Sequence, residues 1–331
     1  MTRARKVLKN ETIAIIGYGV QGPAQALNLR DNGFKVIIGQ AKKFAKDWER
    51  ARKDGWVPGK TLFDIEEAVQ QGTIIQMLVS DAAQRSIWPM VKRNLKPGDA
   101  LYFSHGFSIA YKSLTQVVPP ADVDVIMVAP KSPASEERKA FLQGFGVPGL
   151  ISVRQNASGK ARDIALAMAK TMGFTRAGCL ECTFEEETHE DLFGEQVVLC
   201  GGCVELMKAG FEVLVEKGYP PEMAYFEVLH ELKLIVDLIF EGGIQKMNAI
   251  ISNTAEWGEY SVGPKIIDAG VKQRMREALQ AIEDGSFAKE WLAEARNGAP
   301  NLLAKRKALG NHPIEIVGRE IRALFEQKLQ K

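Results

Sequence analysis

The sequence lacks a marked excess of charge of either sign, and it lacks long apolar runs. Its 331 residues carry a net charge of +2, and 25% of them are charged. A chain so nearly neutral gives no general reason to expect binding to nucleic acid or to an anionic membrane. No apolar run approaches the roughly 20 residues of a membrane-spanning helix. With 46% hydrophobic residues, the chain is expected to fold as a globular protein with room for two domains.

Signals for export, linkers and repeats are also missing. The first ten residues are basic but contain no apolar core of the kind found in signal peptides, so we expect a cytoplasmic protein. No low-complexity linker and no short-period repeat interrupts the chain. The division into domains must therefore be inferred from changes in the pattern of secondary structure.

Cysteine is scarce, and its arrangement leaves two interpretations. The four cysteines form two Cys-x-x-Cys pairs, Cys179 with Cys182 and Cys200 with Cys203, at a spacing that resembles a zinc ribbon. A ribbon needs a β-hairpin between the pairs, whereas residues 191–199 have a helical pattern. Cysteine in an apolar helix often acts as a small hydrophobic residue. Buried free thiols are therefore favoured over zinc, and a zinc assay would decide.

A glycine-rich motif between two strands dominates the N-terminal part. Residues 12–16 form an apolar, β-branched run typical of a buried strand, and residues 34–39 form a second apolar run. Between them a G-x-G-x-x-G motif precedes a helical pattern, and its residues are Gly17, Tyr18, Gly19, Val20, Gln21 and Gly22. In this order the motif predicts a dinucleotide site, where the backbone approaches the pyrophosphate at the helix N-terminus.

Further strands alternate with helices up to about residue 154 and predict a doubly wound parallel sheet of the Rossmann type. Loops that follow such strands carry the chemistry. His105 and Lys131 each follow a predicted strand and are candidate catalytic residues, although histidine or lysine in such loops is often structural. The third strand ends in side chains that could bond to the cofactor's ribose, namely Ser80, Asp81 and Gln84.

The pattern of secondary structure changes after residue 183. Strand-like runs stop, and long helical patterns continue to the C-terminus. We therefore predict a dinucleotide-binding domain over residues 1–183 and an all-helical domain over residues 184–331.

The helical part contains two carboxylate pairs. Asp191 and Glu195 are four residues apart, as are Glu227 and Glu231, so each pair lies on one face of a helix. Glu195 and Glu231 share their stripes with apolar residues, so we expect both stripes to face a core. An ionised carboxylate there must be paired or bind a metal, and carboxylates suit a hard cation such as Mg²⁺. The alternative is two amphipathic helices with solvated acidic edges.

Several long blocks resemble one enzyme family. They are Ser-His105-Gly-Phe, Ala-Pro-Lys131, Glu187-Thr188, Asp191-Leu-Phe-Gly-Glu195-Gln, Ala-Tyr-Phe-Glu227, Leu-His-Glu231-Leu-Lys-Leu-Ile-Val-Asp-Leu, and Ile-Ser252-Asn-Thr-Ala-Glu256. In this order, and from about residue 8 to residue 325, they resemble the ketol-acid reductoisomerases, also called acetohydroxyacid isomeroreductases, of the short class I type.

The resemblance implies a knotted helical domain, an exception to the usual topology, and a two-step reaction in valine and isoleucine biosynthesis. The substrates would be 2-hydroxy-3-oxo acids, 2-acetolactate or 2-aceto-2-hydroxybutyrate. A methyl or ethyl group migrates with Mg²⁺ catalysis, and hydride from NADH or NADPH then reduces the 2-oxo acid to a 2,3-dihydroxy acid.

The resemblance also implies the roles of individual residues. Two Mg²⁺ ions would be held by Asp191, Glu195, Glu227 and Glu231. Ser252 would bind the substrate carboxylate, and the implied catalytic residues are His105, Lys131, Glu195 and Glu231. His105 would also lie beside the nicotinamide. The enzyme would be a homodimer with shared sites, or a higher oligomer, in which the partner supplies the second carboxylate pair and Ser252.

The chain departs from the family pattern at the cofactor. Val20 and Ala134 replace a serine and a glycine of the family's cofactor loops, and alanine accepts a positive φ poorly. The loop after the second strand lacks the family's arginine and serines, and its candidate cofactor contacts are Gln40, Lys42, Lys43 and Asp47. Asp47 would accept bonds from ribose hydroxyls and repel a 2′-phosphate, whereas the lysines could hold one. We predict that NADH is used well, with NADPH tolerated.

Two other functions stay open at this point. A β-hydroxyacid dehydrogenase also joins a dinucleotide domain to a helical one, but it needs no metal, so a reaction insensitive to EDTA would favour it. A nucleotide-sensing or scaffold protein would bind the cofactor without turnover. The two carboxylate pairs argue against both.

Overall fold

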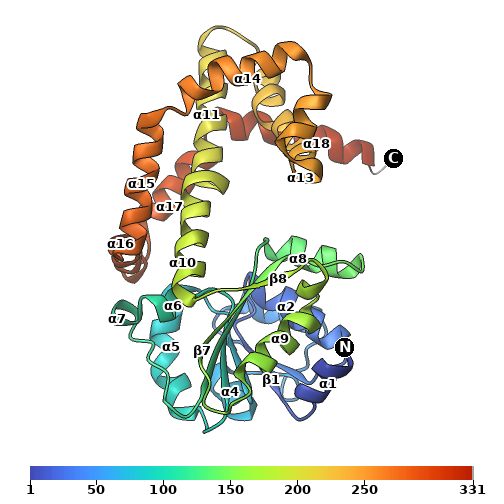
Figure 1. The fold of residues 1–331 in the computed structure, drawn as a ribbon, viewed down its shortest axis with the longest axis vertical. Coiled ribbons are helices and arrows are strands. Elements are labelled where there is room, and N and C mark those ends of the chain that lie inside the picture. The colour runs from blue at the N-terminus through green and yellow to red at the C-terminus, as the bar shows by residue number, and fades with distance from the viewer. Residues whose placement is uncertain (330–331) are drawn as a thin grey trace. The chain divides into compact units, whose positions relative to one another are not determined.

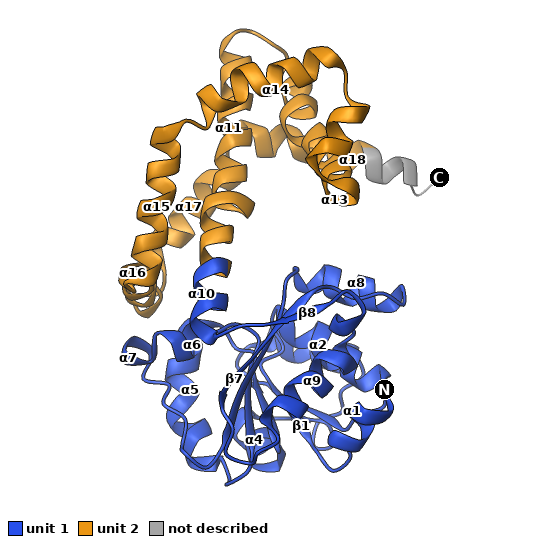
Figure 2. Ribbon diagram, in the orientation of Figure 1, with its two compact units in different colours: residues 1–190 blue, residues 191–331 orange. Residues whose placement is uncertain are grey.

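A computed structural model describes the chain over residues 1–329, with side chains described over residues 1–324 (Figure 1). The chain divides into two compact units, residues 1–190 and residues 191–331 (Figure 2). The division falls within helix α10 (Phe184–Phe193), whose first residue coincides with the predicted start of the helical domain. Of the helices that the structure describes, none combines the length and apolar character needed to cross a bilayer.

Unit 1 contains an eight-stranded sheet with the order β3-β2-β1-β4-β5-β6-β7-β8. The strands are β1 (Ile13–Ile16), β2 (Val36–Gly39), β3 (Leu62–Phe63), β4 (Ile74–Met77), β5 (Ala100–Phe103), β6 (Asp124–Pro130), β7 (Gly149–Gln155) and β8 (Cys179–Glu181). Strands β1 to β6 are parallel and have the order of a Rossmann fold. The predicted Rossmann-type domain is therefore confirmed.

Helices cover both faces of this sheet (Figure 1). They are α1 (Thr2–Val7), α2 (Gln21–Asp31), α3 (Ala45–Lys53), α4 (Ile65–Gln71), α5 (Asp81–Asn94), α6 (Phe107–Ala110), α7 (Lys112–Thr115), α8 (Ala134–Leu142) and α9 (Ala161–Met172). Side chains alternate along β1, so Ile13 and Ile15 join one hydrophobic cluster while Ala14 and Ile16 join the other. One hydrophobic core therefore lies on each face of the sheet. Because β1 to β6 are parallel, their carboxyl ends lie at the same edge of the sheet.

One strand departs from the predicted parallel sheet. The prediction treated residues 151–154 as one more strand of that sheet, but β7 runs antiparallel to β6. Pro130, the last residue of β6, pairs with Gly149, the first of β7. After α8 the chain thus enters β7 at the same edge of the sheet at which β6 ends. An antiparallel neighbour of this kind needs no connection that crosses back over the sheet. Strand β8 pairs parallel to β7 and was not predicted.

A buried carboxyl joins α2 to α8. The side chain of Glu137 is 1% exposed, and its Oε1 accepts a bond from Asn28 at 3.2 Å. Arg138 donates to Asn28 and to Asp31 and so ties the same two helices together. Burial raises the pKa of Glu137 to about 8. The folded protein therefore holds a proton on this carboxyl near neutral pH.

This proton makes stability depend on pH. Because the pKa of Glu137 is about 8 in the folded protein and 4.5 ordinarily, unfolding releases its proton between these values. The free energy of unfolding should fall as pH rises from about 5 to 8, by at most about 1.4 kcal/mol per pH unit. Glu137→Gln removes this effect. The melting temperature of the variant should therefore exceed that of wild type by a margin that grows as pH rises. Parallel melting temperatures for the two proteins across pH 5 to 8 would contradict the assignment.

Unit 2 is helical throughout its described residues. Its helices are α11 (Gly201–Glu216), α12 (Pro221–Tyr225), α13 (Glu231–Ile250), α14 (Asn253–Ile266), α15 (Ala269–Glu283), α16 (Ser286–Arg296), α17 (Pro300–Gly310) and α18 (Pro313–Leu329). Two π-helical segments, η2 (Gly194–Leu199) and η3 (Phe226–His230), interrupt the α-helices. The sequence pattern did not reveal α17 or the π-segments, but the predicted helical domain is confirmed.

Unit 2 has a small core of its own. A cluster around Phe211, Tyr225 and Ile321 joins α11, α12 and α18. Many large apolar side chains are exposed in the single chain, including Leu199 at 69%, Phe240 at 90% and Trp257 at 71%. Among the stripe residues, Val198, Leu199 and Leu234 are exposed, so the core that the stripes of Glu195 and Glu231 were expected to face is not formed within the single chain. Periodicity identifies an apolar face, but it does not say which chain covers that face.

Candidate functional site

The glycine-rich loop has the form that a bound dinucleotide requires. Gly17 has φ +104°, and a Cβ there would lie 2.8 Å from the backbone nitrogen of Val79. At Gly22 a Cβ would collide with the carbonyl of Gly17, so α2 packs closely on the loop. A Cβ at Gly19 would instead meet open space. The close approach that a pyrophosphate needs is available at Gly19, and the residues fit the group.

The side chains of Tyr18 and Gln40 have structural roles beside this loop. Tyr18 is fully buried, its hydroxyl donates to Asp54 at 2.9 Å, and Trp56 donates to the same hydroxyl at 2.8 Å. Burial raises the pKa of Tyr18. Gln40 Oε1 accepts the backbone N–H of Tyr18 at 2.8 Å. A cofactor would therefore meet the backbone of Tyr18 rather than its ring.

Polar atoms without partners line the first turns of α2 and α5. The side-chain oxygens of Gln21 and Gln84 are buried, and neither has a hydrogen-bond partner within the described residues. Ser80 is the N-cap residue of α5, Asp81 is its first residue, and Gln84 donates to the carbonyl of Val79 at 3.3 Å. These residues lie at the ends of β1 and β4, where the sequence predicted contacts with the cofactor.

The loop after β2 is short, because α3 begins at Ala45. Asp47 thus lies in the first turn of a helix and is half-buried. Lys42 lies over the ring of Trp48 and Lys43 over the ring of Phe44, each 5.4 Å from the ring centroid. The acidic and basic candidates for cofactor contact therefore all lie on this short loop and the start of α3.

Ala134 begins α8 directly after Pro133, its N-cap residue. Within residues 1–329, positive φ outside glycine occurs at Gln116 and Ala299. The φ angle of Ala134 is therefore not positive. The doubt that the replacement of glycine raised for this loop does not apply.

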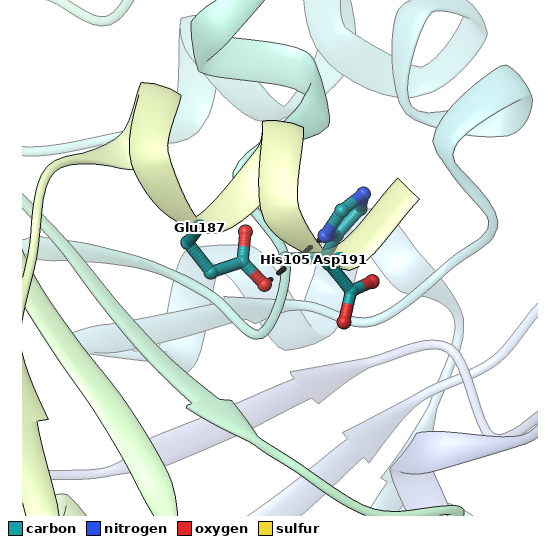
Figure 3. A group of neighbouring side chains, drawn as sticks. All are labelled: His105, Glu187 and Asp191. Carbon is teal, nitrogen blue, oxygen red and sulfur yellow. Dashed lines mark hydrogen bonds and ion pairs between the residues drawn. The ribbon is translucent and has the colours of Figure 1, made fainter. Parts of the chain in front are cut away.

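His105 is held by a glutamate that the sequence interpretation did not assign. Glu187 is 1% exposed; its Oε1 lies 3.1 Å from His105 Nδ1, and its Oε2 accepts the backbone N–H of Gly106 at 2.7 Å. Figure 3 shows this contact below helix α10. The carboxylate therefore orients the imidazole through its Nδ1. Because the partners lie 82 residues apart, the sequence did not pair them, although Glu187 lies one turn before Asp191 and within one of the blocks that resemble the family.

Lys131 is contacted by the same helix. It follows β6, and its Nζ lies 2.7 Å from Glu190 Oε1. Its backbone N–H donates to Pro148, which fixes the start of the loop. Helix α10 thus supplies carboxylates to both basic candidates at the ends of β5 and β6.

The two carboxylate pairs each include a π-helical residue. Glu195 lies in η2, where its carbonyl accepts the N–H of Cys200, five residues later. Glu227 lies in η3, and Glu231 directly follows it as the first residue of α13. Such π-segments occur frequently at functional sites. The same interruption therefore recurs at both pairs, and their joint role in metal binding stays a prediction.

The described residues bring one of the four carboxylates, Asp191, together with other potential metal ligands. Asp191 follows Glu187 on α10, and one ligand atom each from His105, Glu187 and Asp191 lies within 4.8 Å of the others. This group of potential metal ligands, found among the described residues, contains none of Glu195, Glu227 and Glu231. The last two are exposed in the single chain.

Ser252 lies at the start of a long helix. It is the N-cap residue of α14, its Oγ accepts the backbone N–H of Ala255 at 3.2 Å, and it is exposed. The N-terminus of a helix of 14 residues carries partial positive charge and unpaired N–H groups, which favour a carboxylate. This placement suits the predicted contact with the substrate carboxylate.

The cysteines are free thiols. Cys179, Cys182 and Cys203 are half-buried, and Cys200 is exposed. A helix and a π-segment, not a hairpin, occupy the residues between the two pairs. The predicted burial of the thiols is therefore found only in part: three of them are half-buried, and Cys200, just before α11, is exposed.

Comparison with known proteins identifies the family. The model for "Acetohydroxy acid isomeroreductase, NADPH-binding domain" matches residues 7–178, and that for "Ketol-acid reductoisomerase, C-terminal domain" matches residues 184–327. The chain is 58% identical over 321 residues to a "Ketol-acid reductoisomerase (NADP(+))" of Akkermansia muciniphila, covering 97% of this chain and 96% of that protein.

A second relative has a different cofactor in its name. A "Ketol-acid reductoisomerase (NAD(+))" of the uncultured archaeon GZfos26G2 is 55% identical over 327 residues, covering 97% of this chain and 96% of that protein. The solved structure of an "NADH-preferring ketol-acid reductoisomerase from an uncultured archean" has a TM-score of 0.93 and 55% identity, with 96% of each chain covered. The likeness spans the dinucleotide-binding domain and the helical domain alike, so this chain is an NAD(P)H-dependent enzyme that belongs to the ketol-acid reductoisomerase family.

Proposed function

We propose that this enzyme converts 2-acetolactate and 2-aceto-2-hydroxybutyrate into 2,3-dihydroxy-3-methyl acids for valine and isoleucine biosynthesis. An alkyl group moves from C2 to C3, and the resulting 2-oxo acid accepts a hydride at C2. The observation that carries the proposal is the pair of π-interrupted helical segments bearing Asp191, Glu195, Glu227 and Glu231. The relatives' names fit this chemistry.

The donor set fits a pair of Mg²⁺ ions. Four carboxylates offer only oxygen ligands, which Mg²⁺ prefers over nitrogen and sulfur. Asp191, Glu195, Glu227 and Glu231 would hold the ions, which when bound would polarise the substrate carbonyl and stabilise negative charge on its oxygens. His105 and Glu187 lie next to Asp191 but belong to the acid–base machinery in this proposal.

The residues of unit 1 supply proton transfer and electrostatic support. During migration a proton must leave the C2 hydroxyl and reach the C3 oxygen. His105, oriented through Nδ1 by Glu187, would exchange that proton through Nε2. The ammonium of Lys131, placed at the end of β6 beside Glu190, would favour negative charge on the substrate. NADH or NADPH, bound along the glycine-rich loop, would supply the hydride.

The exposed apolar surface of unit 2 supports a homodimer. Soluble chains rarely leave large contiguous apolar patches uncovered, yet side chains such as Phe240 and Trp257 are largely exposed. A second copy of the chain would cover them, and the partner's Glu227, Glu231 and Ser252 would complete the site around Asp191 and Glu195. The knotted topology of the helical domain stays a prediction.

The imidazole should affect turnover rather than metal binding. His105→Gln removes a group able to exchange a proton, so kcat on 2-acetolactate should fall about 100-fold, while the affinity for Mg²⁺ changes little. Glu187→Gln, which keeps the size of the side chain, should give a smaller loss because it acts through His105. Turnover assays with a Mg²⁺ titration of each variant check both effects. A large loss of Mg²⁺ affinity in His105→Gln would make the histidine a metal ligand.

Asp47 should favour NADH. Its carboxylate can accept bonds from the ribose hydroxyls and repels a 2′-phosphate. Asp47→Ser should shift the ratio of kcat/KM values toward NADPH by about tenfold. A wild-type enzyme that prefers NADPH by more than about 100-fold, or roughly 2.7 kcal/mol, would show that basic residues set the choice.

The fate of the migrating carbon tests the proposed reaction. With 2-acetolactate carrying ¹³C in the methyl group on C2, the labelled methyl of the product should be bonded to C3, as NMR can establish. A β-hydroxyacid dehydrogenase would reduce the C3 carbonyl directly and leave the label on C2. That result would overturn the proposal.

A further inference from the structure

One arginine of α3 reaches the glycine-rich loop. The Nη1 group of Arg50 donates to the carbonyl of Gly19 at 3.1 Å. Arg50 follows Asp47 by three residues in the same helix, so the two side chains share a face of α3. A carboxylate and a guanidinium therefore lie along the edge of the predicted cofactor site.

Other basic side chains of this segment make different contacts. Lys42 and Lys43 lie over the rings of Trp48 and Phe44, and Arg52 pairs with Glu49 at 3.0 Å. Of these basic side chains, Arg50 is the one that bonds to the glycine-rich loop within the described residues. It is exposed, so the rest of its planar guanidinium is accessible to a ligand.

The C-terminal end of α3, close to Arg50, is held from two sides. Tyr18, in the glycine-rich loop, bonds to Asp54 at the end of α3, and Gln40, after β2, holds the backbone N–H of Tyr18. Arg30, which lies in α2, donates to the carbonyl of Asp54 at a distance of 2.7 Å. These bonds hold the C-terminal end of α3 near the loop, and Arg50, one turn before Asp54, bonds to Gly19.

We propose that Arg50 is a specificity-determining residue that binds the 2′-phosphate of NADPH. In Rossmann domains the group that reads the ribose 2′ position lies about 20 residues after the glycine-rich loop, and an arginine nearby accommodates a 2′-phosphate. Gln40 lies at that distance, but its side-chain oxygen already accepts the backbone N–H of Tyr18. Arg50 has donors in a planar fork that suits a phosphate, and it opposes the repulsion from Asp47.

This inference rests on the use of NAD(P)H by the enzyme, not on the proposed ketol-acid chemistry. The test is direct binding of NADPH and of NADH to the purified enzyme without substrate, followed by calorimetry or by nicotinamide fluorescence. Arg50→Ala should raise the Kd for NADPH about tenfold or more and leave the Kd for NADH within about threefold. Arg50→Lys, which keeps the charge but not the fork, should lie between wild type and Arg50→Ala.

Arg52→Ala serves as the matched control, because Arg52 lies on the same helix but pairs with Glu49. Its affinity for both nucleotides should equal that of wild type. Equal losses of NADH and NADPH binding in Arg50→Ala would mean that Arg50 contacts the pyrophosphate or only holds the loop, and would overturn the proposal. Unchanged binding of NADPH would overturn it as well. A lack of turnover on 2-acetolactate would leave these binding ratios unaffected.

Discussion

Replacing Glu195 with glutamine should lower turnover of 2-acetolactate by several orders of magnitude. The change keeps the shape of the side chain and removes the charge of one proposed ligand to Mg²⁺. Glu195 lies in the π-segment η2 and is exposed in the single chain, so the loss would reflect missing chemistry and not a disrupted core. Steady-state assays across a Mg²⁺ titration give the measurement.

Glu212 offers a matched control on the neighbouring helix α11. It is exposed, its Oε1 lies 2.8 Å from His312 Nε2, and it is not among the proposed ligands. Glu212→Gln should retain turnover, and both variants should melt as wild type does to within a few degrees. Near-normal turnover by Glu195→Gln would show that the metal assignment is wrong.

Mixing two inactive chains should restore activity if the sites are shared between subunits. Asp191→Ala removes one side of a site and Glu231→Ala removes the other. In a mixed dimer one site carries both faults and the other carries neither. Mixed dimers isolated by two different affinity tags should therefore show about half of the wild-type activity, one intact site of two, while each variant alone is inactive.

A second mixture provides the control for this experiment. Asp191→Ala combined with Glu195→Ala places both faults on the same side, so each site of the mixed dimer has one fault, and activity should stay absent. If the site were complete within one chain, neither mixture would be active. An active monomer, observed by gel filtration coupled to an assay, would also contradict the shared site.

The Rossmann part of the fold could be predicted because its signals are local. The β-branched run before Gly17 and the glycine spacing after it determine strand, loop and helix over a few residues. The direction of β7 could not be predicted in this way. It depends on where the chain re-enters the sheet after α8, and residues 143–148 do not encode that choice as a periodic pattern.

Only part of the candidate site could be predicted, because only some of its signals are local in the sequence. Carboxylate pairs four residues apart are visible in a sequence, as is a histidine at the end of a strand. The bond between Glu187 and His105 joins residues far apart in the chain, so only the folded structure identifies the glutamate as the partner. The apolar stripes around Glu195 and Glu231 were recognised, but periodicity cannot distinguish burial by the same chain from burial by a partner.

The most direct test of the proposed function is oxidation of NADH and NADPH on 2-acetolactate, with Mg²⁺ and again after removal of metal by EDTA. Turnover should require the divalent ion, return when Mg²⁺ is restored, and yield 2,3-dihydroxy-3-methylbutanoate. Turnover that is unchanged in EDTA, or cofactor binding without any turnover when Mg²⁺ is present, would contradict the central claim that metal-bound carboxylates and a dinucleotide site act on one substrate.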